Sequence, residues 1–271
     1  MDNQADTYKK PRKPLKSALS SKAFKRYLSV SMAAIIVILV FVGFIYISGG
    51  RRSGIPDDID FIQLEAPGDN QPVVVFETSL GELKAVLYPD DAPEYCRYFT
   101  SLVESGYYDG TYFCAVVDSA YSLGGTKHPD PSQAETEDSD LTSLEAEISD
   151  RLWPIRGALA SYTGSKGFGP FAKNYAGSTF IMINDIDDAY MNEDALKRSY
   201  GDQLGGVFAE NGGIPNFLRK YTIFAQIYDG WEAFETLMSQ EVLESSQPAS
   251  DIIIERAYIT TYGETVITAA E

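Results

Sequence analysis

The stretch from Gly106 to Thr126, GYYDGTYFCAVVDSAYSLGGT, constrains the fold of this chain more than any other. Its Asp109-Gly110 pair is a turn signal, and the β-branched and aromatic residues at 111–117 predict a strand directly after the turn. A second short apolar run ends at Gly124-Gly125. A glycine pair at the end of a strand indicates a sharp bend or the close approach of another part of the chain. We therefore expect two consecutive strands packed tightly against their neighbours.

A second constraint is an uncharged apolar segment, residues 28–48 (LSVSMAAIIVILVFVGFIYIS). At about 1.5 Å per residue, a helix of this length measures roughly 31 Å, enough to cross the hydrocarbon core of a bilayer. A cleaved signal peptide is the alternative. Signal peptides, however, have a shorter apolar run that ends in small residues, and ISGGRR at 47–52 is a poor cleavage site. We expect a single transmembrane helix that anchors the chain in the cell membrane.

Charge is distributed unevenly on the two sides of this segment. Residues 1–27 hold eight Lys/Arg and two Asp, a net charge of +6, and predict a basic tail that stays in the cytoplasm. The residues after Arg52 hold 12 basic and 37 acidic side chains, a net charge of −25, and are expected on the extracytoplasmic side. This acidic part would repel phosphates, so we do not expect it to bind nucleic acid.

The extracytoplasmic part divides into three segments. Residues 49–71 mix glycine, proline and charge without periodicity and predict a linker. Residues 72–262 contain the periodic apolar segments and predict one mainly β domain, and residues 263–271 predict a C-terminal tail that frays. Within the domain, the patterns predict a hairpin at 72–88, a helix from Ala92-Pro93, strands at 178–184 and 252–260, and helices at about 193–204 and 231–243.

Few residues are suited to metal binding or redox chemistry. Cys96 and Cys114 fall in apolar surroundings, where they are interpreted as small buried side chains, although a disulfide is compatible with an oxidising exterior. His128, the only histidine, lies in a polar loop and is interpreted as solvated. A cluster of four carboxylates has enough oxygens for calcium, but it equally fits an acidic helix start: Asp185, Asp187, Asp188 and Glu193. We favour the helix start, and expect no metal and no cofactor.

Taken together, four segments resemble the cyclophilin-type peptidyl-prolyl isomerases. They are G-Y-Y-D-G-T-x-F with its later G-G, then R-G-A-L-A at 156–160, S-T-F-I-M-I-N at 178–184 and G-G-I-P-N-F-L-R-K-Y-T-I-F at 212–224. Each is weak alone, but they occur in the family's order and with sensible spacing over residues 73–260. The resemblance implies a closed antiparallel β-barrel of about eight strands capped by two helices, which leaves no exposed sheet edge.

The resemblance also implies a chemistry. Rotation about an X–Pro bond crosses a barrier of about 18–20 kcal/mol that amide resonance sets. A catalyst needs a pocket for the proline ring, hydrogen-bonding groups for the flanking backbone, and a charge that favours the twisted amide nitrogen. Cyclophilins are understood to supply that charge with an arginine. At the corresponding position this chain has Ala115.

Other family positions have changed as well. Two pocket phenylalanines correspond to Ala120 and Ile181, and two backbone-gripping glutamines correspond to Leu123 and Thr179. Aromatic residues are frequent among the remaining positions. The resemblance thus assigns no catalytic residue and predicts a peptide-binding groove formed by Ala115, Ala120, Tyr121, Leu123, Tyr162, Thr163, Thr179, Ile181, Asn216, Phe217 and Tyr221. A cation elsewhere in the domain, Arg156, Arg219 or Lys220, would have to replace the missing arginine.

Three functions are compatible with this pattern. The first is an anchored isomerase with weak residual activity that assists proteins folding outside the membrane. The second, which we favour, is a pseudo-isomerase that binds proline-containing or extended peptides without turning them over. The third is a structural domain of an envelope complex whose groove binds nothing. The expected partners are extracytoplasmic proteins or proline-containing peptides.

Overall fold

The computed structural model describes residues 55–56, 58–133, 144–166, 173–186 and 192–264. The expected transmembrane segment at 28–48 and the basic tail before it lie outside these ranges, as does most of the C-terminal tail. Within the described ranges, every helix is too short or too polar to span a bilayer. Residues 54–271 form one compact unit, and the described structure belongs to it.

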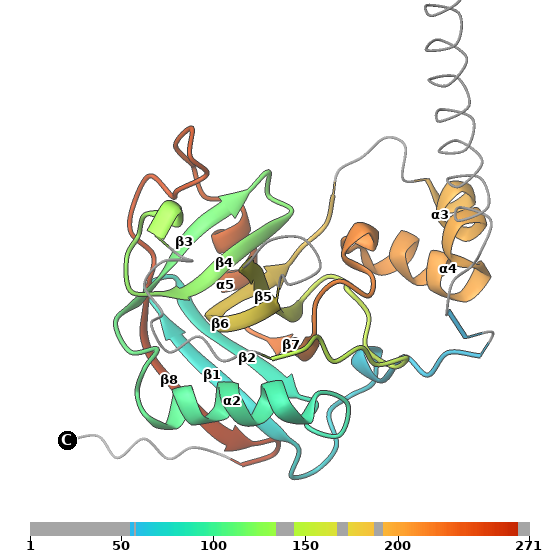
Figure 1. Cartoon of the computed structure of the whole chain (residues 1–271), viewed down its shortest axis with the longest axis horizontal. Helices are drawn as coiled ribbons and strands as arrows, with labels where there is room; N and C mark the ends of the chain where they lie inside the picture. Colours follow the sequence, from blue (N-terminus) through green and yellow to red (C-terminus); the bar gives the residue numbers. More distant parts are fainter. Residues whose placement is uncertain (1–54, 57, 134–143, 167–172, 187–191, 265–271) are drawn as a thin grey trace, which may run out of the picture. The chain divides into compact units, whose positions relative to one another are not determined.

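Eight strands close into an antiparallel barrel (Figure 1). Around the barrel they follow the order β1-β2-β7-β5-β6-β4-β3-β8, so each strand pairs with a neighbour on both sides. The closed barrel confirms the sequence-based expectation, and closure removes the sheet edges on which chains aggregate. The strands are β1 (Pro72–Thr78), β2 (Gly81–Leu87), β3 (Thr111–Val117), β4 (Tyr121–Thr126), β5 (Ala158–Lys166), β6 (Lys173–Ile183), β7 (Ile223–Asp229) and β8 (Ile253–Thr261).

Close packing around the hairpin of β3 and β4 explains the pair Gly124-Gly125. Residues 118–120 connect the two strands, and Asp118 and Ser119 have φ 48° and 55°, the positive values that a primed turn requires. At Gly124, a Cβ would lie 2.7 Å from the ring of Phe113. Gly125 has φ 87°, and a Cβ there would be crowded by a tyrosine ring and a backbone carbonyl. Both glycines are thus required by close packing, as the sequence predicted.

Two helices complete the core of the barrel, as expected. α2 (Pro93–Glu104) starts at the predicted proline, and α5 (Trp231–Met238) follows β7. Both contribute apolar side chains to the same cluster as the barrel interior. At the centre of that cluster the ring of Phe180 lies 5.3 Å from that of Phe76 and 6.0 Å from that of Phe99. Burial of large aromatic side chains is the main apolar contribution to the stability of this framework.

The acidic insertion at 127–150 supplies a cap for α2. Ala92 precedes this helix and has no side chain that accepts a hydrogen bond. Instead, the Glu147 carboxylate accepts hydrogen bonds from the backbone N–H groups of Glu94 (3.0 Å) and Tyr95 (2.8 Å). An acidic side chain at a helix N-terminus satisfies free N–H groups and interacts favourably with the helix dipole.

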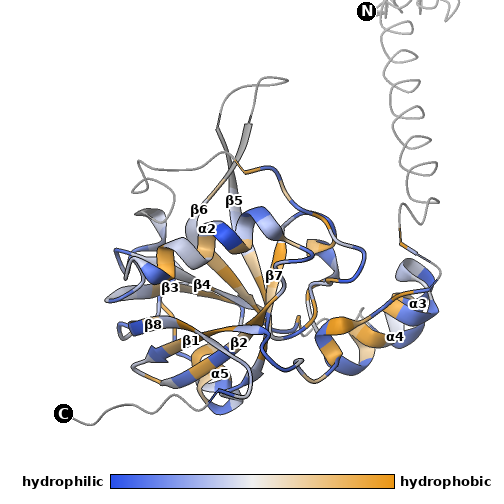
Figure 2. Cartoon of the chain, turned by 90° about the horizontal axis from the view of Figure 1, so that it is seen from below, coloured by the Kyte–Doolittle hydropathy of each residue, from blue (hydrophilic) through white to orange (hydrophobic). Residues whose placement is uncertain are grey.

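The second acidic insertion, 185–212, forms two further helices, α3 (Glu193–Tyr200) and α4 (Asp202–Asn211), rather than one. Gly201 separates them, because its φ of 87° cannot continue a helix. Asn192 caps α3 by accepting a hydrogen bond from the Ala195 N–H at 2.9 Å. α4 carries both hydrophobic and hydrophilic residues (Figure 2). Its hydrophobic residues pack into a satellite cluster outside the barrel core.

Two other segments differ from the sequence-based expectation. α5 ends at Met238 instead of 243, because the following loop turns back and its Ser246 carbonyl accepts a hydrogen bond from the Val116 N–H of β3 at 2.9 Å. Residues 58–65, in the stretch predicted as a linker, contact the folded domain and include the short 3-10 helix η2 (Ile62–Leu64). We call residues 58–65 the strap.

Candidate functional site

The predicted groove residues come from four strands, a 3-10 helix and two connecting segments, and the structure brings most of them into one apolar cluster. Ala115 on β3 pairs with Leu123 on β4, and Leu123 pairs with Ile181 on β6. Ala120, at the end of the β3–β4 turn, is buried in the same cluster. The half-buried aromatic positions pack against it: Tyr121, Tyr162, Phe217 and Tyr221. Strand pairing therefore places these small and aliphatic side chains beside one another, at the positions where the sequence predicts a groove.

Three aromatic rings at the predicted groove positions lie next to one another. The ring of Tyr121 lies 5.4 Å from that of Phe217, which lies 4.9 Å from that of Tyr221, and both pairs meet edge to face. Phe217 is carried by the 3-10 helix η5 (Pro215–Phe217), whereas Tyr121 opens β4. Burial, with smaller contributions from Tyr221 and Asp118, raises the pKa of Tyr121. The Tyr121 hydroxyl therefore stays protonated at neutral pH and can donate a hydrogen bond to a peptide carbonyl.

The three polar positions of the predicted groove lie in different environments. Thr179 is buried on β6 and shares a strand face with Ile181, because side chains two apart point the same way. The Thr163 hydroxyl on β5 lies 3.2 Å from that of Ser161. Asn216 is exposed on η5. These side chains provide donors and acceptors, but Thr179 is shorter than the glutamine that the resemblance to cyclophilins places at its position.

The position expected to carry the catalytic arginine is closed to solvent. Ala115 is 2% exposed, and its carbonyl accepts a hydrogen bond from the Ser122 hydroxyl at 2.9 Å. The floor at this point is thus apolar, with its backbone carbonyl already bonded. A methyl group has no charge or donor to offer a twisting amide.

Two of the candidate replacement cations are held by other partners. The Arg156 guanidinium donates to the Asn184 side-chain oxygen at 2.9 Å and lies 5.3 Å from the ring centre of Trp231 on α5. It also forms an ion pair with Glu235. Arg219 forms an ion pair with Asp150. Lys220 is exposed. Both guanidinium groups therefore have acidic partners that a role in the groove would have to displace.

Sequence reasoning missed several residues of the groove. Leu152, Ile214 and Ile223 are buried in the same cluster, and Ile62 of the strap packs against it. The apolar run of 212–224 contained a signal for Ile214 and Ile223. Ile62 gave no such signal, because it is a single isoleucine in an aperiodic, charged segment and is covered by a distant part of the chain.

Cysteine chemistry is excluded from the groove by burial. Cys114 is fully buried and Cys96 nearly so, and both are free thiols rather than a disulfide. Burial raises the pKa of Cys114 to about 11 and that of Cys96 to about 12. A thiol with such a pKa is protonated at neutral pH and is a poor nucleophile. Both cysteines are packing residues, in agreement with the favoured interpretation of the sequence.

Comparison with known proteins assigns the family. The model of the family described as "Cyclophilin type peptidyl-prolyl cis-trans isomerase/CLD" matches residues 73–259, well over half of the chain. The chain is a cyclophilin. The match covers the whole barrel and both helices that complete its core.

Several relatives support this assignment of the cyclophilin domain. One from Streptococcus pyogenes, named "Putative bifunctional phosphatase/peptidyl-prolyl cis-trans isomerase", is 29% identical over 205 residues, which cover 74% of this chain and 41% of that protein. This chain thus spans about two fifths of that relative. A "Putative peptidyl-prolyl cis-trans isomerase" from Staphylococcus haemolyticus is 27% identical over 191 residues, 69% of this chain and 90% of that one.

A solved structure agrees with the barrel of this cyclophilin. It is the crystal structure of a Cryptosporidium parvum cyclophilin type peptidyl-prolyl cis-trans isomerase in the presence of the dipeptide Ala-Pro. The TM-score is 0.50 with 25% sequence identity, and the match covers 69% of this chain and 98% of that chain.

Proposed function

We propose that this cyclophilin domain binds proline-containing or extended peptides in its groove and has weak or lost cis-trans isomerase activity. The observation that carries the proposal is Ala115, a buried methyl group at the position where the family resemblance places the catalytic arginine. Removal of one oriented donor typically lowers an enzymatic rate by about 10²–10³. The binding surface, in contrast, remains apolar and rich in aromatic side chains.

The aromatic wall supports binding. Tyr121, Phe217 and Tyr221 present ring edges and faces on one side of the apolar floor. Aromatic-lined grooves bind proline-rich segments well, because such peptides are already extended and lose little conformational entropy. The Tyr121 hydroxyl adds a donor for a peptide carbonyl. The solved relative in the presence of Ala-Pro is consistent with a proline-containing ligand for this fold.

We further propose that this domain acts outside the cell membrane, with residues 28–48 as its anchor. The support is the uncharged 21-residue segment, the net charge of +6 before it and the net charge of −25 after Arg52. Its partners would then be extracytoplasmic proteins. Protease treatment of intact cells tests this placement: the domain should be digested from outside while residues 1–27 stay protected, and protection of the domain would contradict it.

The central test compares turnover with binding in the full chain. A proline-peptide isomerisation assay should give activity at least a hundredfold below that of an ordinary cyclophilin, whereas a peptide array should give positive spots. Activity within tenfold of an ordinary cyclophilin would establish the alternative that the relatives' names favour, an active folding isomerase. An empty array would instead leave a structural domain.

Matched variants refine this test. Phe217→Ala removes the central ring of the aromatic wall and should weaken peptide binding by about tenfold, since buried aromatic contacts are worth over 1 kcal/mol. Arg156→Ala, Arg219→Ala and Lys220→Ala should leave any residual turnover unchanged. A hundredfold loss of turnover in one of these three would reveal an arginine or lysine that has replaced the missing group.

A further inference from the structure

The strap is fixed to the domain by a buried glutamine. Gln63 is only 6% exposed. Its Nε2 donates to the Trp153 carbonyl at 3.0 Å and to the Gln226 Oε1 at 2.9 Å, and its Oε1 accepts from the Trp153 N–H at 2.5 Å. One side chain thus satisfies both backbone groups of residue 153. Removing a partner from buried polar groups is costly, so this contact strongly favours the docked strap.

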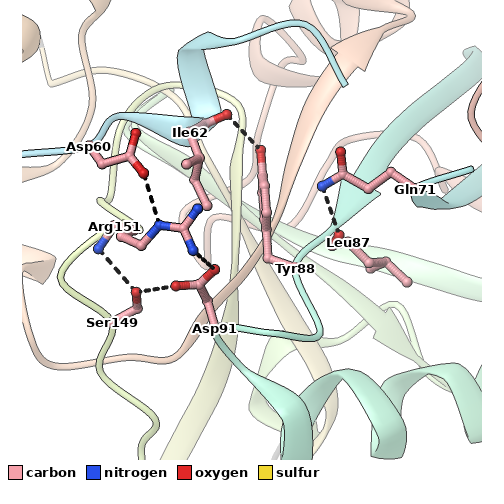
Figure 3. A network of polar contacts seen from close by, with 8 residues as sticks. All are labelled: Asp60, Ile62, Gln71, Leu87, Tyr88, Asp91, Ser149 and Arg151. Atoms are coloured by element: carbon pink, nitrogen blue, oxygen red, sulfur yellow. Dashed lines mark hydrogen bonds and ion pairs between the residues drawn. The ribbon is translucent and has the colours of Figure 1, made fainter. Parts of the chain in front are cut away.

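A polar network holds the strap at the surface (Figure 3). The Arg151 Nε lies 3.1 Å from the Asp60 carboxylate of the strap, and its Nη1 lies 3.4 Å from the Asp91 carboxylate just before α2. The Ser149 hydroxyl donates to the same Asp91 side chain at 2.7 Å. Figure 3 shows the Arg151 guanidinium between the two carboxylates. Arg151 therefore connects the strap to the start of α2, although exposed ion pairs contribute little each.

The apolar residues of the strap pack in two directions. Ile62 packs against the cluster that forms the groove floor. Ile59 and Phe61 pack instead in the satellite cluster with Trp153 and the helices α3 and α4. The segment 152–155 also contributes to both clusters: Leu152 belongs to the cluster that contains Ala115, and Trp153 belongs to the satellite cluster. The strap therefore lies against the residues that separate the two clusters.

A short series of backbone contacts leads from Trp153 to the groove wall. The next residue, Pro154, accepts a hydrogen bond at its carbonyl from the Ile214 N–H at 2.9 Å. Ile155 forms an antiparallel bridge with Gly213. The Ile214 carbonyl accepts in turn from the Phe217 N–H at 2.8 Å. The backbone that carries the Phe217 ring is thus attached to the segment that Gln63 holds in place.

We propose that Gln63 is a positioning residue for the peptide groove, and that the strap sets the orientation of the Phe217 wall. This inference rests on the proposed peptide binding. Gln63 itself contacts no groove ligand, because its three bonds go to Trp153 and Gln226. Undocking the strap would let the 152–155 and 213–217 segments shift together. A groove built this way binds peptide only while the segment that precedes the barrel is docked.

The experiment compares Gln63→Met with Gln71→Met in the full chain. Methionine keeps the length of the side chain and removes its hydrogen bonds. Gln71 is the matched control, because it lies between the strap and β1 and also makes side-chain hydrogen bonds. Its side chain accepts from the Gly68 N–H at 3.0 Å and donates to the Leu87 carbonyl at 3.4 Å, away from the predicted groove residues. We expect Gln63→Met to weaken binding of an array-selected proline peptide five- to tenfold, and Gln71→Met to change it less than twofold.

Amide hydrogen exchange distinguishes a local change near Phe217 from a loss of stability of the whole domain. In Gln63→Met, the N–H groups of Ile214 and Phe217 should exchange at least tenfold faster. The Phe113 N–H, bonded to the Ile252 carbonyl at 2.9 Å in the barrel, should exchange at its wild-type rate. Equal acceleration at all three amides, or none at Ile214 and Phe217, would overturn the positioning role.

The two proposals fail in different ways. If the wild-type chain binds no array peptide, the proposed function is wrong, and hydrogen exchange alone then decides whether Gln63 positions the wall. If the wild-type chain binds peptide and Gln63→Met binds it equally well, the peptide function stands and the positioning role is wrong. Weaker binding together with local acceleration at Ile214 and Phe217 supports both.

Discussion

Replacing Gly125 by alanine tests whether close packing, rather than backbone conformation alone, requires the glycine pair at the end of β4. Gly125 has φ 87°, and an added Cβ would lie 2.6 Å from the Tyr108 ring and 2.8 Å from the Ser178 carbonyl oxygen. The Tyr108 hydroxyl donates to that same carbonyl at 2.8 Å, so neither group can retreat without weakening this bond. A positive φ costs an alanine about 1–2 kcal/mol, and overpacking adds about 1–3 kcal/mol.

Gly110→Ala is the matched control, because Gly110 has φ 79° but nothing within 4 Å of the added Cβ. It should lose only the conformational contribution of about 1–2 kcal/mol. Thermal unfolding followed by circular dichroism measures both variants. For a domain of this size, 1 kcal/mol corresponds to roughly 2–4 °C, so the overpacking contribution should make Gly125→Ala melt roughly 2–12 °C below Gly110→Ala. Equal melting temperatures would refute the packing argument.

Three further predictions address the core, the thiols and the surface. Phe180→Ala should lower the free energy of unfolding by about 3–5 kcal/mol in denaturant titrations, because the ring is buried among other aromatic rings. Between pH 9 and 12 the free energy of unfolding should fall as the pH rises, because the thiol of Cys96 ionises near pH 9 in the unfolded chain but, when buried, only near pH 12. In a Cys96→Ala variant, the plot of this free energy against pH should be shallower by about 1.4 kcal/mol per pH unit. Lys84, 3.1 Å from Asp229, lowers the pKa of that carboxyl, and Lys84→Met should raise it in an NMR titration.

The barrel was predictable from sequence because its determinants are local. Short patterns in the sequence indicate the hairpin of β1 and β2, the proline that starts α2, and the β-branched and aromatic residues of β3. The order in which the strands close was not predictable from such patterns. It became available only through the resemblance of several motifs to one family, which the match over residues 73–259 confirms.

The remaining features depend on contacts between distant segments. Gly201 was visible inside the predicted helix at 193–204, but only the packing of α3 against α4 shows that it divides the helix in two. The docked strap depends on Gln63 and Trp153, which are 90 residues apart. Glu147 caps α2 from 52 residues away, at the backbone N–H of Tyr95. Such partners cannot be predicted from local sequence propensities, because they are far apart in the chain.

The peptide-binding groove itself stays a prediction. The family resemblance singled out Ala115, Leu123 and Ile181, and strand pairing places these residues beside one another. The near-complete burial of Ala115 and the edge-to-face contact of Tyr121 with Phe217 depend on how side chains fill the space that smaller residues leave. The partners of Arg156 were also hidden, because Glu235 and Trp231 belong to a helix on another part of the chain.

The division of the interior into separate clusters is compatible with the proposed loss of the family's arginine at position 115. The main core, with Phe76, Phe180 and Phe224, contains none of the predicted groove positions. The groove floor belongs to a second cluster, in which Ala115 and Ala120 are buried among aliphatic neighbours. An arginine at position 115 contributes nothing to the main core, so its absence costs the framework little, and a buried methyl avoids the cost of desolvating a charge. The barrel core and the predicted groove positions therefore belong to different sets of residues, so the groove positions can change while the core is retained.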